Sequence, residues 1–348
     1  MTVYYIANQA YQFSYVKPIY HKIGGTFLAT SWTKLIKIRW RLRHGLGLND
    51  SRGLKIARGN NHDLTEFEGV VLSPSNFHIN GTKSKLTTIF VGHGSGDKKY
   101  GGNAGILKTY DYHFISGPKH LAKLADVNIG IPEDRLIKIG NPRFDAYLAG
   151  KIDRAAYLQR LGVREKERPM VLYAPTWRWG NGSLRSMIVP LARELRHSFN
   201  LIIRPHHFDI QLLPWFRLWA KLKGLRHVYF SNPDNLAFHD TMHDFAVSDL
   251  LISDTSSVLY EYLITGKPIV QVQTENEDLH HMPDHLSING KVDTIRADDT
   301  ASIAGVVARN LSDQPYRDEY RQLLQECFYL SDGRATDRAV EFIRSVDH

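Results

Sequence analysis

The chain has 348 residues, of which 43% are hydrophobic and 23% charged, and its formal net charge is +8. This length accommodates two domains with full cores, and the charge favours anionic partners such as nucleotides, phosphorylated lipids, membrane surfaces or nucleic acids. The single cysteine, Cys327, excludes an intramolecular disulfide and suits a reducing compartment. No apolar segment is long enough to cross a bilayer, and the first residues lack a signal-peptide pattern, so we expect a cytoplasmic protein.

The first part of the chain alternates short apolar runs with polar or helical segments. Strands are predicted at residues 3–6, 27–29, 54–57, 70–72, 88–91, 112–115 and 136–139, with a helix at 119–125. Strands separated by helices indicate an α/β protein with a parallel, doubly wound sheet. The pattern loosens around residues 140–151, where we expect a domain boundary.

The second part repeats the alternation more regularly. Predicted strands are 171–173, 201–203, 228–230, 250–252 and 269–272, and predicted helices include 184–199, 212–222 and one that ends near residue 247. In such sheets the crossovers are right-handed, and ligands bind at the carboxyl ends of the strands.

The segment SDLLISDTSSVLYEYLITGKPIV, residues 248–270, predicts a strand, a turn, a helix and a further strand. Its turn carries Asp254, Thr255, Ser256 and Ser257 directly before the helix. Hydroxyls and free amides at a helix N-terminus bind anions, but the same residue types also serve simply as helix caps. Spacing alone favours neither interpretation.

The segment VGHGSGDKKYGG, residues 91–102, places a histidine after a predicted strand. The flanking glycines let the backbone approach a ligand closely, and a neutral His93 can take a proton from an attacking hydroxyl. The segment is not a Walker A loop, because no Lys-Ser or Lys-Thr pair follows the last glycine, and it is not a nucleophile elbow around Ser95. A turn with a hydrogen-bonded histidine is the alternative.

Three arginines follow other predicted strands: Arg143 in GNPRFD, Arg178 in YAPTWRWGNGS and Arg204 in IIRPHH. Guanidinium groups suit phosphate, although Arg143 is explained equally well as half of a solvated ion pair at a hinge. In an extended segment Arg204 and His206 project the same way, and His207 points elsewhere.

Histidines also occur in DLHHMPDH, residues 278–285, but no spacing matches a zinc site, so we expect no metal and no other cofactor. Two basic amphipathic stretches, residues 34–44 and 212–227, mix Trp, Phe or Leu with Lys or Arg, as helices on anionic membranes do. For the second stretch, ordinary packing on a sheet explains the apolar residues as well.

In this order, the segments GHGSGDK, GNPRFD, YAPTWR, RPHH, SDLLISDTSS and SDGRATDR resemble the CDP-glycerol glycerophosphotransferase family of teichoic acid and capsule synthesis. The resemblance runs from about Val91 to Arg338. It implies a GT-B fold, in which two Rossmann-like domains face each other across a cleft. We then expect an acceptor-side domain at residues 1–145, a donor-binding domain at 146–330, and a last helix, within 331–348, that crosses back to the first domain.

The resemblance also implies a reaction, in which glycerol phosphate or another polyol phosphate moves from a CDP-polyol to a hydroxyl of a lipid-linked or polysaccharide acceptor, releasing CMP. Such enzymes are peripheral at the inner face of the cell membrane. His93 would match the catalytic base, and His206 a second essential histidine that stabilises charge on the diphosphate. The residues expected to hold phosphate are Arg143, Arg178, Arg204, Asp254, Thr255, Ser256 and Ser257. Where the family has Thr-Pro after His-Gly, this chain has Ser95 and Gly96.

Two other functions remain open from the sequence. A GT-B glycosyltransferase that uses a nucleotide-sugar would have the same fold. A non-catalytic nucleic-acid binder is compatible with the net charge, but no nucleic-acid motif is present and the basic residues are not gathered in one stripe, so we expect no nucleic-acid partner.

Overall fold

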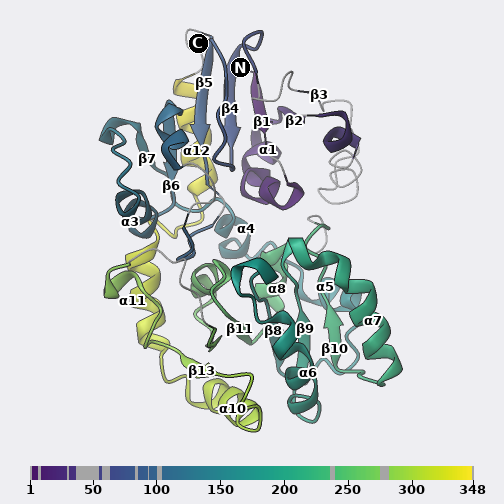
Figure 1. The fold of residues 1–348 in the computed structure, drawn as a ribbon. Helices are drawn as coiled ribbons and strands as arrows, with labels where there is room; N and C mark the ends of the chain where they lie inside the picture. Colours follow the sequence, from purple (N-terminus) through teal and green to yellow (C-terminus); the bar gives the residue numbers. More distant parts are fainter. Residues whose placement is uncertain are drawn as a thin grey trace.

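A computed structural model of the chain describes residues 2–6, 9–29, 31–36, 55–56, 63–82, 85–92, 94–99, 104–235, 240–274 and 282–346. Two parallel sheets form the two halves of the molecule, and helices cover their faces (Figure 1). Every predicted strand is present, with its ends within two residues of the expected ones. The predicted α/β class is therefore correct.

The first sheet has seven strands in the order β3-β2-β1-β4-β5-β6-β7. They are β1 (Val3–Ile6), β2 (Thr26–Ala29), β3 (Lys55–Ile56), β4 (Gly69–Ser73), β5 (Leu86–Phe90), β6 (Tyr112–Ile115) and β7 (Leu136–Lys138). The intervening helical segments are η1 (Ala10–Tyr15), α1 (Lys17–Ile23), η2 (Ala104–Thr109), α3 (Pro118–Asp126) and η3 (Glu133–Arg135). The strands are apolar on both faces because helices pack on both sides of a parallel sheet.

The second sheet has six strands in the order β10-β9-β8-β11-β12-β13. They are β8 (Met170–Tyr173), β9 (Asn200–Ile203), β10 (Val228–Phe230), β11 (Leu250–Ser253), β12 (Ile269–Val272) and β13 (Asp293–Ile295). Its main helices are α5 (Arg154–Leu161), α6 (Leu184–Glu194), α7 (Leu213–Leu222), α8 (Thr241–Val247), α9 (Val258–Tyr262), α10 (Ile303–Asp313) and α11 (Arg317–Cys327). Strand order reverses beside β1 in one sheet and beside β8 in the other, and these switch points are where open α/β sheets bind ligands.

The helix expected at 184–199 is shorter in the structure. Helix α6 ends at Glu194, and a turn carries the chain to β9. Leu195 and Phe199 are nevertheless buried in the same core as the helix, so the apolar spacing continues after the helix has ended. Cys327 is also buried, and burial raises the pKa of its thiol to about 12, as fits a core residue rather than a nucleophile.

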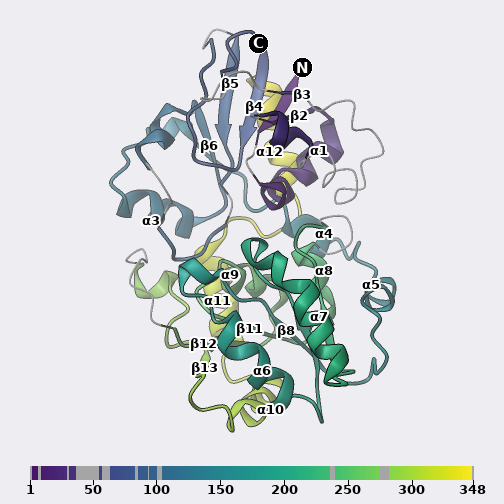
Figure 2. The ribbon, with the colours of Figure 1, turned by 45° about the vertical axis from the view of Figure 1, so that its right-hand side comes forward.

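The last helix, α12 (Ala335–Ser345), lies beside the first sheet in both views (Figure 1 and Figure 2). Ala339, Val340 and Ile343 belong to the core that β1 and β4 build. The carboxylate of Asp145 accepts hydrogen bonds from the first amides of α12, at 3.2 Å from Ala335 N and 2.7 Å from Thr336 N. The chain thus returns from the second sheet to the first, and none of the helices in the described residues is long and apolar enough to span a bilayer.

Candidate active site

A cavity of about 740 Å³ lies between the two halves, at the carboxyl ends of their strands. The segment after β5 lines it from the first half, and the segments after β8, β9 and β11 line it from the second. Of the residues predicted from the sequence, Arg143, Arg204, His206, Thr255, Ser256 and Ser257 line this cavity. His93 lies outside the described residues, although its neighbours Gly92 and Gly94 line the cavity.

The side chain of Asp254 forms its hydrogen bonds within the protein and does not line the cavity. Its carboxylate is fully buried and accepts hydrogen bonds from Thr176 N at 2.7 Å and from Ser183 N and Oγ, each at 2.9 Å. These bonds hold the loop after β8 against the loop after β11. Asp254 is therefore a positioning residue, and the residues that follow it, Thr255 to Ser257, are the ones that line the cavity.

The helix after this turn is short. Helix α9 has five residues and continues as the 3-10 turn η6 (Leu263–Thr265), which ends at Gly266 with a φ of +63°. The hydroxyl of Ser256 accepts a long bond of 3.4 Å from Val258 N. A helix this short has only a weak dipole. Anion binding at this turn would therefore depend mainly on the hydroxyls and side chains around the cavity, and less on the helix N-terminus that the sequence suggests.

The glycine-rich loop of the first half approaches Ser257 of the second half very closely. A Cβ atom on Gly94 would lie 2.9 Å from Ser257 Oγ, and one on Gly96 would lie 2.9 Å from Ser257 N and Cα. Real Cβ atoms do not approach so closely, and Gly94 also has a φ of +137°. The glycine at 96, where the resembled family has proline, therefore allows the two halves to meet here.

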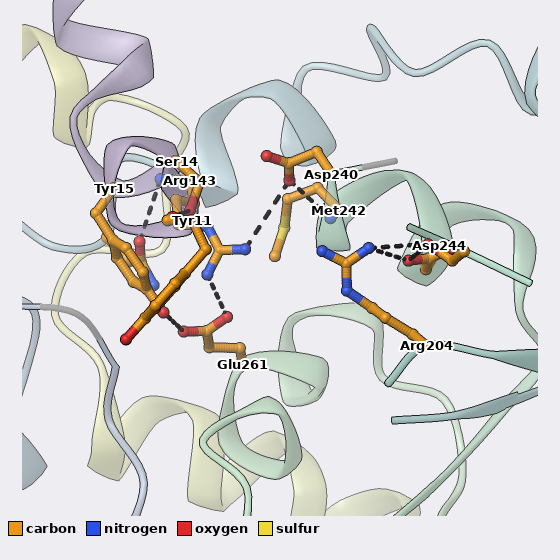
Figure 3. Close-up of polar contacts among 11 residues, drawn as sticks. Tyr11, Ser14, Tyr15, Arg143, Arg204, Asp240, Met242, Asp244 and Glu261 are labelled. Atoms are coloured by element: carbon orange, nitrogen blue, oxygen red, sulfur yellow. Dashed lines mark hydrogen bonds and ion pairs between the residues drawn. The ribbon is translucent and has the colours of Figure 1, made fainter. Parts of the chain in front are cut away.

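Arg204 is held by an ion pair on its own side of the cavity. Its Nη1 atom lies 2.8 Å from Asp244 Oδ2 (Figure 3). The same atom lies 2.9 Å from Ser231 Oγ, and Tyr157 donates to the other carboxylate oxygen of Asp244 at 2.7 Å. Burial raises the pKa of the Asp244 carboxyl, and the charge of Arg204 opposes that shift. The pair orients Arg204 and neutralises most of its charge.

Arg143 joins the two halves instead of meeting solvent. Its Nη1 atom lies 2.6 Å from Glu261 Oε2 and its Nη2 atom 3.9 Å from Asp240 Oδ1 (Figure 3). The hydroxyl of Tyr15 donates to the other oxygen of Glu261 at 3.2 Å, and the guanidinium lies 4.6 Å from the centre of the Tyr15 ring. The hinge interpretation with a solvated pair is wrong, because the partner is Glu261 and the pair is buried.

The two adjacent histidines both line the cavity. His206 stacks on Trp177 with ring centres 6.3 Å apart, and its Nδ1 accepts from Phe208 N at 3.3 Å. His207 Nδ1 lies 2.7 Å from Asp234 Oδ1, and its Nε2 faces Gln9 of the first half at 3.1 Å. The expectation that His207 points elsewhere is wrong because β9 ends at Ile203 and its alternation does not extend this far.

Arg178 is exposed and is not among the residues that line the cavity. Its amide donates to Asp209 Oδ2 at 3.2 Å, and its guanidinium lies 5.2 Å from the centre of the exposed Trp179 ring. Within the described residues, no group of three His, Cys, Asp or Glu side chains could hold a metal ion.

Sequence reasoning missed a further set of residues in the cavity wall. Lys98 and Lys99 of the glycine-rich loop line the cavity, and the Nζ atom of Lys98 donates to the hydroxyl of Thr176 in the second half. The missed lining residues are Tyr11, Ser14, Tyr15, His120, Lys123, Asp240 and Glu261. The signal for His120 and Lys123 was available, since both follow a predicted strand within the segment PKHLAKLAD.

The model of the CDP-glycerol:poly(glycerophosphate) glycerophosphotransferase family matches residues 95–345. The chain belongs to this family. It is 28% identical to the teichoic acid glycerol-phosphate primase of Bacillus subtilis (strain 168) over 170 residues, which are 47% of this chain and 40% of that protein. It is 25% identical to the ribitol-phosphate polymerase TarK of Staphylococcus aureus (strain NCTC 8325 / PS 47) over 255 residues, which are 67% of this chain and 45% of that protein. The chain thus spans less than half the length of these relatives.

Two solved structures show the same fold. That of the wall teichoic acid polymerase TagF aligns with a TM-score of 0.66 at 15% identity, covering 99% of this chain and 88% of that one. That of UDP-GlcNAc 2-epimerase from Neisseria meningitidis, bound to UDP-GlcNAc, aligns with a TM-score of 0.63 at 14% identity, covering 99% and 100%. These likenesses confirm the predicted GT-B architecture for this member of the glycerophosphotransferase family.

Proposed function

We propose that this chain transfers glycerol phosphate or another polyol phosphate from a CDP-activated polyol to a hydroxyl of a membrane-bound or polysaccharide acceptor, in teichoic acid or capsule synthesis. The observation that carries the proposal is the cavity between the two halves, lined by the Ser/Thr turn after β11 on one side and by the basic, glycine-rich loop on the other. Relatives named as teichoic acid primases and polymerases, and a TagF variant studied with CDPG, support this substrate class.

The donor diphosphate would lie against the second half, between the turn at Thr255 to Ser257 and the segment with Arg204 and His206. Hydroxyls donate hydrogen bonds to phosphate oxygens, and Lys98 brings a positive charge from the first half. Fixed donors of this kind stabilise the charge that develops on the leaving phosphate. Because Arg204 is already paired with Asp244, it would contribute orientation more than net charge.

In the proposed reaction the acceptor hydroxyl attacks the phosphorus atom that carries the polyol. The bond between this phosphorus and the bridging oxygen breaks, CMP leaves, and the hydroxyl proton passes to a base. We assign the base to His93, on the basis of the motif and of the place of Gly92 and Gly94 in the cavity wall. We assign Arg143 to the joint between the halves rather than to direct phosphate contact, and Arg178 to the loop outside the cavity.

A panel of nucleotide ligands tests the donor assignment. CDP-glycerol, CDP-ribitol and CDP should each raise the thermal unfolding midpoint of the purified protein, since a ligand that binds only the folded state stabilises it by mass action. UDP and UDP-sugars at equal concentration should not. Stabilisation by UDP-sugars alone would contradict the proposal and favour a glycosyltransferase.

A further inference from the structure

Helix α3 turns a basic face toward the cavity from the first half. It lies at the edge of that half nearest the second (Figure 2). His120 and Lys123, three positions apart and so on one face of the helix, both line the cavity together with Gly92 and Gly94. Both side chains are more than nine-tenths buried, with exposed fractions of 8% and 6%. None of the roles assigned above uses either residue.

The imidazole of His120 makes no hydrogen bond within the part of the chain that the structure describes. Its ring faces Phe90 at 6.5 Å, and a Cβ atom on Gly92 would lie 3.5 Å from its Cε1 atom. Buried polar side chains are almost always hydrogen-bonded, so a ring of this kind at a cavity wall is available to a ligand. Burial, helped by the charge of Lys123, lowers the pKa of His120 to about 3, and the neutral ring can both donate and accept.

Lys119 lies one helical turn before Lys123 and makes different contacts. Lys119 lies 2.8 Å from the carbonyl oxygen of Leu286, forms an ion pair with Asp97, and sits 3.7 Å from the centre of the Tyr260 ring. It therefore joins α3 to the second half. Lys123 lies beside the cavity, where burial lowers its pKa to about 8, against the charge of Asp97, which raises it, and with that of Lys119, which lowers it further. Lys119 and Lys123 thus give this helix two buried ammonium groups, and that of Lys123 lies at the cavity wall.

We infer that His120 and Lys123 form a subsite for a phosphate of the acceptor, next to the hydroxyl that attacks. The inference rests on the proposed function. In that reaction the donor diphosphate lies against the second half and meets Lys98, whereas His120 lies beside Gly92, the neighbour of the proposed base His93, since a Cβ atom on Gly92 would be 3.5 Å from its Cε1 atom. A site next to the base belongs to the substrate whose hydroxyl attacks. The Nζ atom of Lys123 would pair with a phosphate oxygen, and His120 would hydrogen-bond to the polyol. The acceptor then ends in a polyol phosphate, and the chain extends such an end instead of starting on an uncharged sugar.

Steady-state kinetics with two acceptors on the same lipid test this subsite, one ending in glycerol phosphate and the other in an unphosphorylated sugar. Lys123→Met should raise the KM for the phosphorylated acceptor about tenfold to a hundredfold, as expected for one charge-assisted hydrogen bond. The KM for CDP-glycerol should not change. Lys123→Arg should keep most of the parent's acceptor affinity. Lys85→Met, at an exposed lysine paired with Glu68, is the control and should leave every parameter unchanged.

A calorimetric titration with glycerol 3-phosphate in the presence of CMP tests the subsite without turnover. Lys123→Met and His120→Leu should weaken this binding at least tenfold, while thermal unfolding shows that both variants fold. Unchanged binding, or an equal rise in KM for both acceptors or for the donor, would overturn the inference and leave the proposed function intact. If the parent transferred nothing from CDP-polyols, the proposed function itself would fail.

Discussion

At the scale of single residues, two arginines of the cavity wall are held in buried ion pairs, which neutralise part of the positive charge there. Arg204 is paired with Asp244 and Arg143 with Glu261, and in each pair both partners are at most 9% exposed. Removing one member of such a pair leaves the other charge buried and without compensation, which is much costlier than losing an exposed pair.

Glu261→Gln should therefore lower the free energy of unfolding by about 3 to 5 kcal/mol, because among the described residues Arg143 then has only the more distant Asp240 as an acidic partner. Chemical unfolding followed by fluorescence measures the change. The matched control is Asp298→Asn, in the exposed pair with Arg296, which should leave the unfolding midpoint in place. Equal effects of the two substitutions would show that the buried pair does not join the halves.

A buried histidine outside the cavity predicts how stability depends on pH. His113 Nε2 donates to Leu107 O at 3.0 Å, its Nδ1 has no partner among the described residues, and burial lowers its pKa to about 4. The unfolded chain, with a histidine pKa near 6.5, binds this proton first as the pH falls. Stability should therefore decrease from about pH 6.5 down to pH 4, by on the order of 3 kcal/mol at about 1.4 kcal/mol per pKa unit.

Thermal unfolding midpoints between pH 4 and 8 test this prediction. His113→Gln can still donate to Leu107 O and should show a shallower decrease on the acid side than the parent. The matched control is His197→Gln, at an exposed position. A decrease of the same slope in His113→Gln and in the control would contradict the assignment.

At the scale of elements, the strands were the most predictable part of the chain. Buried parallel strands are continuous apolar runs, and β8, β9 and β11 each show one. Strand β13 was missed because it has three residues at the sheet edge and begins with Asp293. The segments η1 and α1 were missed as well, although η1 places Tyr11 and Tyr15 at the cavity. Their apolar residues, such as Phe13 and Ile19, do not form a regular amphipathic pattern.

Helix α7 is apolar on two faces, which packing on the sheet does not explain. Phe216 and Trp219 pack against the core of the second half, whereas Trp215, Leu218 and Leu222 are 69%, 48% and 77% exposed. Arg217, Lys221 and Lys223 lie on the same helix or directly after it. This combination is typical of a helix that binds an anionic membrane. Of the other basic stretch, residues 37–44 lie outside the described residues.

We expect the protein to co-sediment with vesicles that contain anionic phospholipid, and Trp215→Ser with Leu222→Ser to reduce the bound fraction several-fold, because the exposed apolar area is lost. Val189→Ser, at a half-exposed apolar position on α6, is the control and should bind like the parent. Binding that is equally strong to neutral vesicles, or that is unaffected by the double substitution, would contradict a role for α7.

At the scale of the whole molecule, the strands of both halves end on the two sides of one cavity. Helix α12 returns from the second half and packs into the core of the first. The rule that ligands bind at strand ends located part of this wall from the sequence. It did not predict how the charges are used, because pairing depends on contacts between distant residues. Arg143 and Glu261 are 118 positions apart, and Asp254 meets Ser183 across 71. Arg178 likewise follows a strand but lies outside the cavity wall.

Transfer of glycerol phosphate, labelled in the glycerol, from CDP-glycerol to a lipid-linked acceptor that ends in glycerol phosphate tests the central claim most directly. We predict one CMP released for each glycerol phosphate incorporated, no transfer from UDP-sugars, and loss of at least a hundredfold in rate in His93→Ala, since a general base contributes about 10²–10⁴-fold. Incorporation of sugar from a UDP donor, or release of CMP without incorporation into any acceptor, would contradict the account.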